Sequence, residues 1–221
     1  MTQLIHHTAI ISREAQLGRN VSVGPFSVIE GGVIVGDNVS IAAHCHIGIE
    51  PFDFRTRGDG SKVRKKSKLR VVIQNGVEIG SNVFIQKGTS QDTLISRFVT
   101  INNSVNIGHD VEIGEGTNIG FNCSVSGYTK IGMFSDLSPG VVVSNRVTLG
   151  NYCQVGIGSL VLHNYSDHQQ ILGHPAEDIV KYKSQRRAIK EKILGEYKPN
   201  RVASSRNNLT RLLKRFVRRV L

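Results

Sequence analysis

The sequence has few of the residues that usually fill a large globular core. Its 221 residues include no tryptophan, two methionines, five prolines and three cysteines, and aromatic residues make up 6% of the chain. Without many rings, the core must be closed by valine, isoleucine, alanine, serine and threonine, which favours stacked, extended backbone. The length allows one domain and an appendage. The composition therefore favours an all-β fold.

Long apolar runs and a leader pattern are missing as well. No stretch of about 18 apolar residues occurs, so we expect no membrane-spanning helix. The first ten residues, MTQLIHHTAI, lack the charged-then-apolar pattern of a signal peptide. We therefore expect a cytoplasmic protein.

Basic charge is abundant but local. The net charge is +11, yet residues 1–180 hold 14 basic and 15 acidic side chains, whereas residues 181–221 hold 14 basic and 2 acidic. Within the first part, residues 48–71 alone carry 8 basic and 3 acidic side chains. The rest of the body is acidic, which argues against a protein that coats nucleic acid.

A period of six residues organises the chain. A branched aliphatic residue, here called the anchor, opens each of 22 six-residue units from Ile5 to Val155, with breaks only after Ile47 and Ile85. The position four residues after the anchor is small or β-branched in 21 of the 22 units, as at Ala9, Val39 and Thr89. Neither a helix nor simple strand alternation gives two restricted positions in six, so the pattern predicts a parallel β-helix.

Each unit should form one short strand and one corner. Three units make a triangular coil of 18 residues, and the chain should contain about seven coils stacked roughly 4.8 Å apart. Glycine often follows the anchor, as tight corners require. Cys45, Cys123 and Cys153 all occupy the small position, so we expect buried cysteines without a catalytic or metal-binding role.

This pattern resembles the hexapeptide-repeat acyltransferases, and the resemblance implies a left-handed parallel β-helix with a C-terminal α-helical extension. It also implies a homotrimer with active sites in grooves between subunits. The hand comes from the resemblance alone, because the usual preference for right-handed parallel crossovers points the other way.

The first break inserts a basic segment at residues 48–71. It can be a solvated loop, or an arm that reaches over a neighbouring subunit and binds phosphates with its cations. Its opening, IGIEPFDF, is similar to the segment in which lipid A UDP-N-acetylglucosamine O-acyltransferases hold the sugar with an aspartate, here Asp53.

The second break, a short bulge at residues 86–94, lies in a segment that resembles UDP-3-O-acylglucosamine N-acyltransferases over roughly residues 72–160. His109 and Gly127 are one 18-residue coil apart and should stack on one edge. In the lipid A acyltransferases a histidine in this segment is the general base and a glycine one coil later contacts the oxyanion, which implies these roles here.

Several neighbours complete the expected site. Asp110 either orients the imidazole or is a solvated corner residue. Asn103 and Arg146 are expected to bind substrate, Arg146 at the place of a second histidine in the N-acyltransferases. His163 and His168 have the five-residue spacing of two zinc ligands in hexapeptide carbonic anhydrases, but the third ligand would fall on Gly127, so we expect no metal.

The C-terminal part, residues 178–221, should be a basic helical extension of a β-helix that spans residues 1–177. Residues 178–197 should form a charged helix and residues 207–221 a basic amphipathic one. By resemblance, His174 and Lys181 are candidates for contact with coenzyme A. The tail can pack on the chain or a sister subunit, bind an anionic membrane through residues 206–221, or bind acyl carrier protein.

Together these features predict transfer of an acyl group, expected to be acetyl from acetyl-CoA, to the amino group of a nucleotide-linked amino sugar in bacterial surface-glycan synthesis. Two alternatives stay open. One is long-chain acyl transfer from acyl carrier protein in lipid A-type synthesis, and the other is a non-enzymatic β-helix scaffold held at the inner membrane by its tail.

Overall fold

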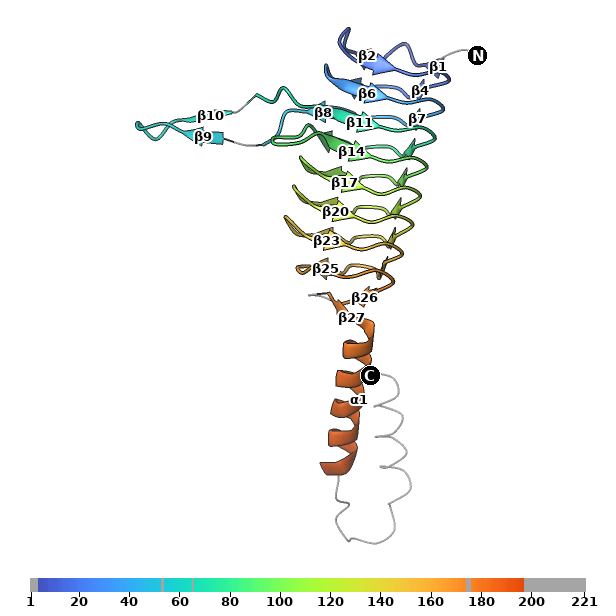
Figure 1. The fold of residues 1–221 in the computed structure, drawn as a ribbon, viewed down its shortest axis with the longest axis vertical. Coiled ribbons are helices and arrows are strands. Elements are labelled where there is room, and N and C mark those ends of the chain that lie inside the picture. The colour runs from blue at the N-terminus through green and yellow to red at the C-terminus, as the bar shows by residue number, and fades with distance from the viewer. Residues whose placement is uncertain (1–3, 53, 65, 174–175, 197–221) are drawn as a thin grey trace. The chain divides into compact units, whose positions relative to one another are not determined.

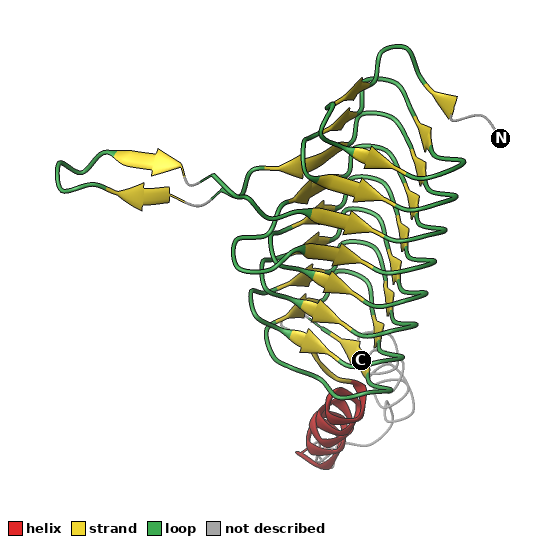
Figure 2. Cartoon of the chain, turned by 45° about the horizontal axis from the view of Figure 1, so that its top comes forward, coloured by secondary structure: helices red, strands yellow, loops and turns green. Residues whose placement is uncertain are grey.

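The computed structural model describes residues 4–52, 54–64, 66–173 and 176–196. The chain divides into two compact units, Met1–Glu177 and Asp178–Leu221. The first unit is a stack of triangular coils with one parallel β-sheet on each of three sides (Figures 1 and 2). Strands one coil apart pair in register, as Asn106 does with Ser124, which confirms the 18-residue coil.

The three sheets follow one another around each coil. The first sheet contains β1 (Leu4–Ile5), β4 (Ser22–Val23), β7 (Ser40–Ile41), β12 (Glu78–Ile79), β15 (Thr100–Ile101), β18 (Asn118–Ile119), β21 (Asp136–Leu137), β24 (Gln154–Val155), β26 (Gln170–Leu172) and β27 (Glu177–Asp178). The second sheet contains β2 (Ile10–Ile11), β5 (Val28–Ile29), β8 (His46–Ile49), β13 (Phe84–Gln86), β16 (Asn106–Ile107), β19 (Ser124–Val125), β22 (Val142–Val143) and β25 (Leu160–Val161). The third sheet contains β3 (Gln16–Leu17), β6 (Val33–Val35), β11 (Val71–Ile73), β14 (Thr93–Ile95), β17 (Glu112–Ile113), β20 (Lys130–Ile131) and β23 (Thr148–Leu149).

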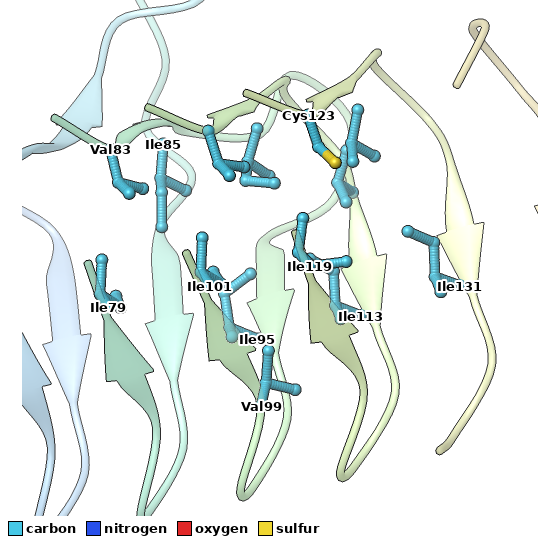
Figure 3. Close-up of a cluster of buried hydrophobic side chains, with 14 of the residues drawn as sticks. Ile79, Val83, Ile85, Ile95, Val99, Ile101, Ile113, Ile119, Cys123 and Ile131 are labelled. Carbon is cyan, nitrogen blue, oxygen red and sulfur yellow. The ribbon is translucent and has the colours of Figure 1, made fainter. Parts of the chain in front are cut away.

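The anchors form the core. From Val23 to Val155 they are buried, and isoleucines of successive coils stack on one another inside the prism, as Ile101 and Ile119 do in Figure 3. Because the interior is narrow and repeats every coil, it accepts side chains of one size, which explains why branched aliphatic residues replace aromatic ones.

Hydroxyl and thiol side chains share the second buried position for one reason. Thr117 donates a hydrogen bond to the Gly132 carbonyl at 2.7 Å, and the Cys123 thiol lies 3.3 Å from the Ser138 carbonyl, in each case 15 residues ahead. The corner therefore supplies an acceptor to whichever small side chain faces it. Burial raises the pKa of Cys45, Cys123 and Cys153, and all three are free, as predicted for inert buried thiols.

The predicted core is wrong at one residue, Thr89. Thr89 does not occupy the inward position of its unit; it is half-buried in the bulge. Thr93, the first residue of β14, is fully buried instead. The four extra residues move the inward position from Thr89 to Thr93, because the coil resumes only when β14 pairs with β11.

The insertion forms a β-hairpin arm. β9 (Phe54–Thr56) and β10 (Lys62–Arg64) pair antiparallel and project away from the coils in Figures 1 and 2. All six residues of the two strands are exposed.

The second unit contains α1 (Ile179–Glu196), within a residue of the predicted helix. Asp178 caps it by accepting hydrogen bonds from the backbone N–H groups of Val180 at 2.9 Å and Lys181 at 3.2 Å. No helix in the described part of the chain is long and apolar enough to cross a membrane. The predicted tail helix at residues 207–221 lies outside the described residues.

Candidate functional site

Both breaks in the repeat and the predicted catalytic residues fall on one edge of the prism. This edge, here called the site corner, is where the chain passes from the second sheet to the third. The arm joins β8 to β11, the bulge joins β13 to β14, and His109 and Asp110 join β16 to β17. One and two coils further on, the same corner carries Gly127 with Tyr128, and then Arg146.

The bulge wraps around the Asp110 carboxylate. One oxygen, Oδ1, accepts hydrogen bonds from the backbone N–H groups of Ser90 (2.7 Å) and Gln91 (2.8 Å) and from the Ser90 hydroxyl (2.9 Å). The other, Oδ2, accepts from the Thr89 N–H (2.9 Å) and hydroxyl (2.6 Å) and lies 2.7 Å from Nδ1 of His109. Asp110 is fully buried, so the solvated-corner interpretation is wrong.

These donors fix the charge of Asp110 and the tautomer of His109. Burial alone would raise the pKa of Asp110, but the hydrogen bonds from Thr89, Ser90 and Gln91 outweigh it and hold that pKa well below its usual range. The carboxylate is therefore ionised and can only accept, so His109 Nδ1 must carry the proton. In neutral imidazole the other nitrogen, Nε2, is then a free acceptor, on a side chain that is 25% exposed.

Gly127 lies against the imidazole, as its position one coil after His109 predicts. A methyl group built on Gly127 would meet Cε1 and Nε2 of His109, each at 2.8 Å. The Gly127 N–H has no acceptor among the described residues. Gly127 lies two residues after an anchor. At another edge, the backbone N–H at this position donates to a side chain of the next coil: the Met133 N–H donates to Asn151 Oδ1 at 2.8 Å. Gly127 thus combines an available amide with close approach to the base.

Tyr128 is the part of the site that sequence reasoning missed. Its ring meets that of His109 edge to face, with centroids 5.0 Å apart, and the Arg146 guanidinium lies 4.2 Å from its centroid. Its hydroxyl is 2.9 Å from Thr89 Oγ1. Tyr128 shares the corner position of Asp110 one coil later, and this 18-residue spacing was the available indication.

The base of the arm is fastened to the bulge beside this network. Glu50 accepts a hydrogen bond from the Ser67 N–H at 2.7 Å and pairs with the Lys87 ammonium at 3.1 Å. Ser67 in turn donates its hydroxyl to the Gly88 carbonyl at 2.6 Å, and Arg70 pairs with Asp92 at 2.9 Å. A pocket of about 390 Å³ opens between the two segments, lined by Pro51, Lys66, Ser67, Lys68, Leu69, Thr89, Ser90 and Tyr128.

The remaining predicted residues lie elsewhere or outside the description. Asn103 is not at the site corner: it lies between the first and second sheets, where Oδ1 accepts a hydrogen bond from the Ser81 N–H at 2.7 Å. Asn103 precedes His109 by one six-residue unit, so it lies on another edge of the prism, where it caps a corner. Lys181 belongs to the second unit. Asp53 and His174 lie outside the described residues.

Metal-binding geometry is not found in the described part of the chain. No group of three histidine, cysteine, aspartate or glutamate side chains there is placed to hold an ion. His168, one of the two histidines with the spacing of zinc ligands, stacks on Tyr152, with ring centroids 4.9 Å apart.

Comparison with known proteins supports the repeat and the fold. Residues 14–48 match the family described as bacterial transferase hexapeptide (six repeats). The UDP-3-O-acylglucosamine N-acyltransferase of Leptothrix cholodnii is 30% identical over 141 residues, which cover 47% of this chain and 41% of that protein. The enzyme of the same name from Rhodopseudomonas palustris strain TIE-1 is 35% identical over 110 residues, covering 50% and 30%. The chain therefore spans less than half of the length of these two relatives.

Solved structures show the same architecture. LpxA from Acinetobacter baumannii superposes with a TM-score of 0.67 at 21% identity, over 84% of this chain and 77% of that one. A UDP-N-acetylglucosamine acyltransferase from Campylobacter jejuni gives a TM-score of 0.61 at 19% identity, over 96% and 90%. At these identities the likeness concerns the fold. The chain therefore has the left-handed parallel β-helix fold, and residues 14–48 match the hexapeptide-repeat family.

Proposed function

We propose that the protein is an acyltransferase that moves an acyl group from a thioester to the amino group of a nucleotide-linked amino sugar. One observation carries this proposal. His109 presents Nε2 over Gly127, while the buried Asp110 carboxylate lies 2.7 Å from Nδ1. This arrangement supplies a base and an adjacent free amide, the two groups that acyl transfer requires.

The chemistry needs no covalent intermediate on the protein. His109 Nε2 accepts a proton from the amine as its nitrogen attacks the thioester carbonyl, and the new C–N bond forms. The carbonyl oxygen becomes an oxyanion that the Gly127 N–H can stabilise, by roughly 3 kcal/mol where comparable donors have been removed. The C–S bond then breaks, the thiolate leaves, and the imidazolium of His109 returns the proton to sulfur. Asp110 stabilises the imidazolium between these steps.

The relatives support the class of acceptor. Their name, UDP-3-O-acylglucosamine N-acyltransferase, describes transfer to a nitrogen of a nucleotide-linked sugar. For this chain we propose acetyl-CoA as the donor and a nucleotide amino sugar of bacterial surface glycans as the acceptor. An acyl carrier protein is the competing donor, as the resemblance to the lipid A acyltransferases implies. We also propose a cytoplasmic homotrimer, to be checked by light scattering.

Incubation of the full chain with acetyl-CoA and a panel of nucleotide amino sugars, read by mass change of the sugar, tests the function. Acyl carrier protein loaded with a long acyl chain is offered in parallel, so the donor that gives turnover is identified. His109→Ala should abolish thiol release and leave the oligomer and its melting temperature unchanged. His7→Ala, an exposed histidine of the first coil, is the matched control and should keep wild-type turnover. Undiminished turnover in His109→Ala would refute the mechanism.

A further inference from the structure

We infer that the pocket at the base of the arm is a phosphate-binding site, in which Lys66 and Lys68 bind the anion. The pocket of about 390 Å³ lies at the site corner, between the segment that follows β10 and the bulge that holds Asp110. Its assignment to a substrate rests on the proposed function, whereas its affinity for phosphate does not. Its size suits a sugar phosphate rather than a large polyanion.

Two lysines and no acidic side chain are among the described residues that line this pocket. Three other cations at the base of the arm have partners: Arg70 pairs with Asp92, Lys87 pairs with Glu50, and Arg64 donates from Nε to the Pro51 carbonyl at 3.2 Å. Lys66 and Lys68 have no ion-pair partner among the described residues, and both line the pocket. Two ammonium groups beside one cavity attract a dianion, since each places a positive charge at its rim.

The walls are fixed without a ligand. Glu50 is held by the Ser67 N–H and the Lys87 ammonium, and Lys87 is only 12% exposed. Burial opposes ionisation of Glu50, but these two partners outweigh it and lower its pKa, so the carboxylate stays charged near neutral pH. The Leu69 N–H also donates to Ser67 Oγ at 2.9 Å, which orders the segment carrying both lysines. A preformed site of this kind loses little entropy when an anion binds.

The hydroxyl groups at the pocket do not compete with the lysines for the anion. Asp110 is a carboxylate, so the hydroxyls of Thr89 and Ser90 both donate to it. Thr89 has one hydroxyl proton, and therefore Tyr128 must donate to Thr89 Oγ1 across their 2.9 Å contact. The Tyr128 oxygen retains a lone pair, which can accept a hydrogen bond from a sugar. The lysines are left as donors for phosphate, with Pro51 and Leu69 as an apolar wall.

Tyr128 connects the pocket to the base. Its ring borders the cavity and also meets the His109 imidazole, with centroids 5.0 Å apart. A molecule whose phosphate lies between Lys66 and Lys68 can therefore extend past Tyr128 towards Nε2 of His109. Two substrates of the proposed reaction carry such a phosphate: the diphosphate of the sugar nucleotide and the phosphates of coenzyme A.

Titration calorimetry of the full chain with inorganic pyrophosphate tests the site without turnover. The double variant Lys66→Ala, Lys68→Ala should weaken binding by about tenfold or more, the loss expected for charge-assisted hydrogen bonds. The control Arg57→Ala, Lys62→Ala removes two cations from the arm outside the pocket and should bind within about twofold of wild type. Equal loss in both double variants, or no saturable binding by wild type, would overturn the proposal.

Competition identifies which substrate supplies the phosphate. Displacement of pyrophosphate by uridine diphosphate but not by coenzyme A assigns the site to the acceptor, and the reverse assigns it to the donor. If neither displaces it, the assignment of the pocket to a substrate of the proposed reaction is refuted. His109→Ala should bind pyrophosphate as wild type does. An inactive wild-type chain that still binds through Lys66 and Lys68 would refute the proposed function alone.

Discussion

Replacing Asp110 with asparagine changes one atom of a side chain that accepts six hydrogen bonds. Oδ1 is surrounded by three donors, two of them backbone N–H groups, so the amide oxygen of the variant should take that place. The new NH₂ group then stands at Oδ2, where it faces the Thr89 N–H and His109 Nδ1. It can donate to Nδ1 only if the imidazole proton moves to Nε2, which removes the base.

The expected loss of turnover is large and the loss of stability moderate. An asparagine in the equivalent place of a serine protease triad lowers kcat about 10⁴-fold by imposing the wrong tautomer, and we expect a loss of roughly 10² to 10⁴-fold here. One buried N–H without an acceptor costs about 1–3 kcal/mol, so Asp110→Asn should lower the free energy of unfolding by that amount at pH 7.

The pH dependence has a definite sign. The pKa of Asp110 is lower in the folded chain than in the unfolded chain, so its carboxylate stabilises the fold at pH values above about 4, the usual range of aspartate. This contribution is lost as the pH falls towards the folded-state pKa. The difference in unfolding free energy between wild type and Asp110→Asn should therefore be largest near pH 7 and shrink towards pH 3.

Thiol release at saturating substrates measures kcat, and urea denaturation followed by circular dichroism measures stability. Asp136→Asn is the matched control, because Asp136 is an exposed aspartate on β21 that accepts one hydrogen bond from Asn118 at 2.7 Å. It should change stability by less than about 0.5 kcal/mol and leave kcat unchanged. If Asp110→Asn keeps kcat within about threefold of wild type while folded, Asp110 does not set the tautomer and this reasoning is wrong.

Three further predictions concern the glycine, the core and the thiols. Gly127→Ala should lose most of its turnover with a melting temperature near that of wild type, because the added methyl group displaces His109. The control Gly58→Ala should be fully active, because a methyl group added there meets no heavy atom beyond its chain neighbours within 4 Å. Ile113→Ala should lower the unfolding free energy by about 2–5 kcal/mol in urea denaturation, whereas the exposed Thr148→Ala on β23 should change it by less than about 0.5 kcal/mol. The three cysteines should not react with Ellman's reagent at pH 8 in the folded protein and should all react in guanidinium chloride, since burial raises their pKa values. Fast reaction of the native protein would contradict their placement inside the coils.

The repeat made most of the fold predictable. A period of six with two restricted positions specifies which residue of each strand points inwards, and a coil of 18 residues then places His109 and Gly127 on the same edge. The same arithmetic excludes Asn103, six residues before His109. Residues occupy the same position of one corner in a regular stretch only when a multiple of 18 separates them, as it separates Gly127 from His109.

The segments that interrupt the repeat were less predictable. The conformation of the bulge depends on a buried carboxylate from the next coil, so neither the Thr89 contact nor the exchange of Thr89 for Thr93 follows from a local pattern. Tyr128 occupies a corner with φ of 61°, where glycine or asparagine is expected from turn preferences. Its contacts with His109 and Arg146 arise only because three coils are stacked.

The site corner also has a consequence for engineering. β11 pairs in register with β6 before it and β14 after it, although the arm and the bulge separate these strands in the chain. Segments of very different length can thus leave and re-enter the prism at this edge without shifting any later coil, and doubling a flexible loop costs only about 0.6 kcal/mol in closure entropy. The arm can therefore be exchanged for loops of other lengths to change recognition, while the bulge that holds Asp110 and the coils that carry His109 and Gly127 are kept.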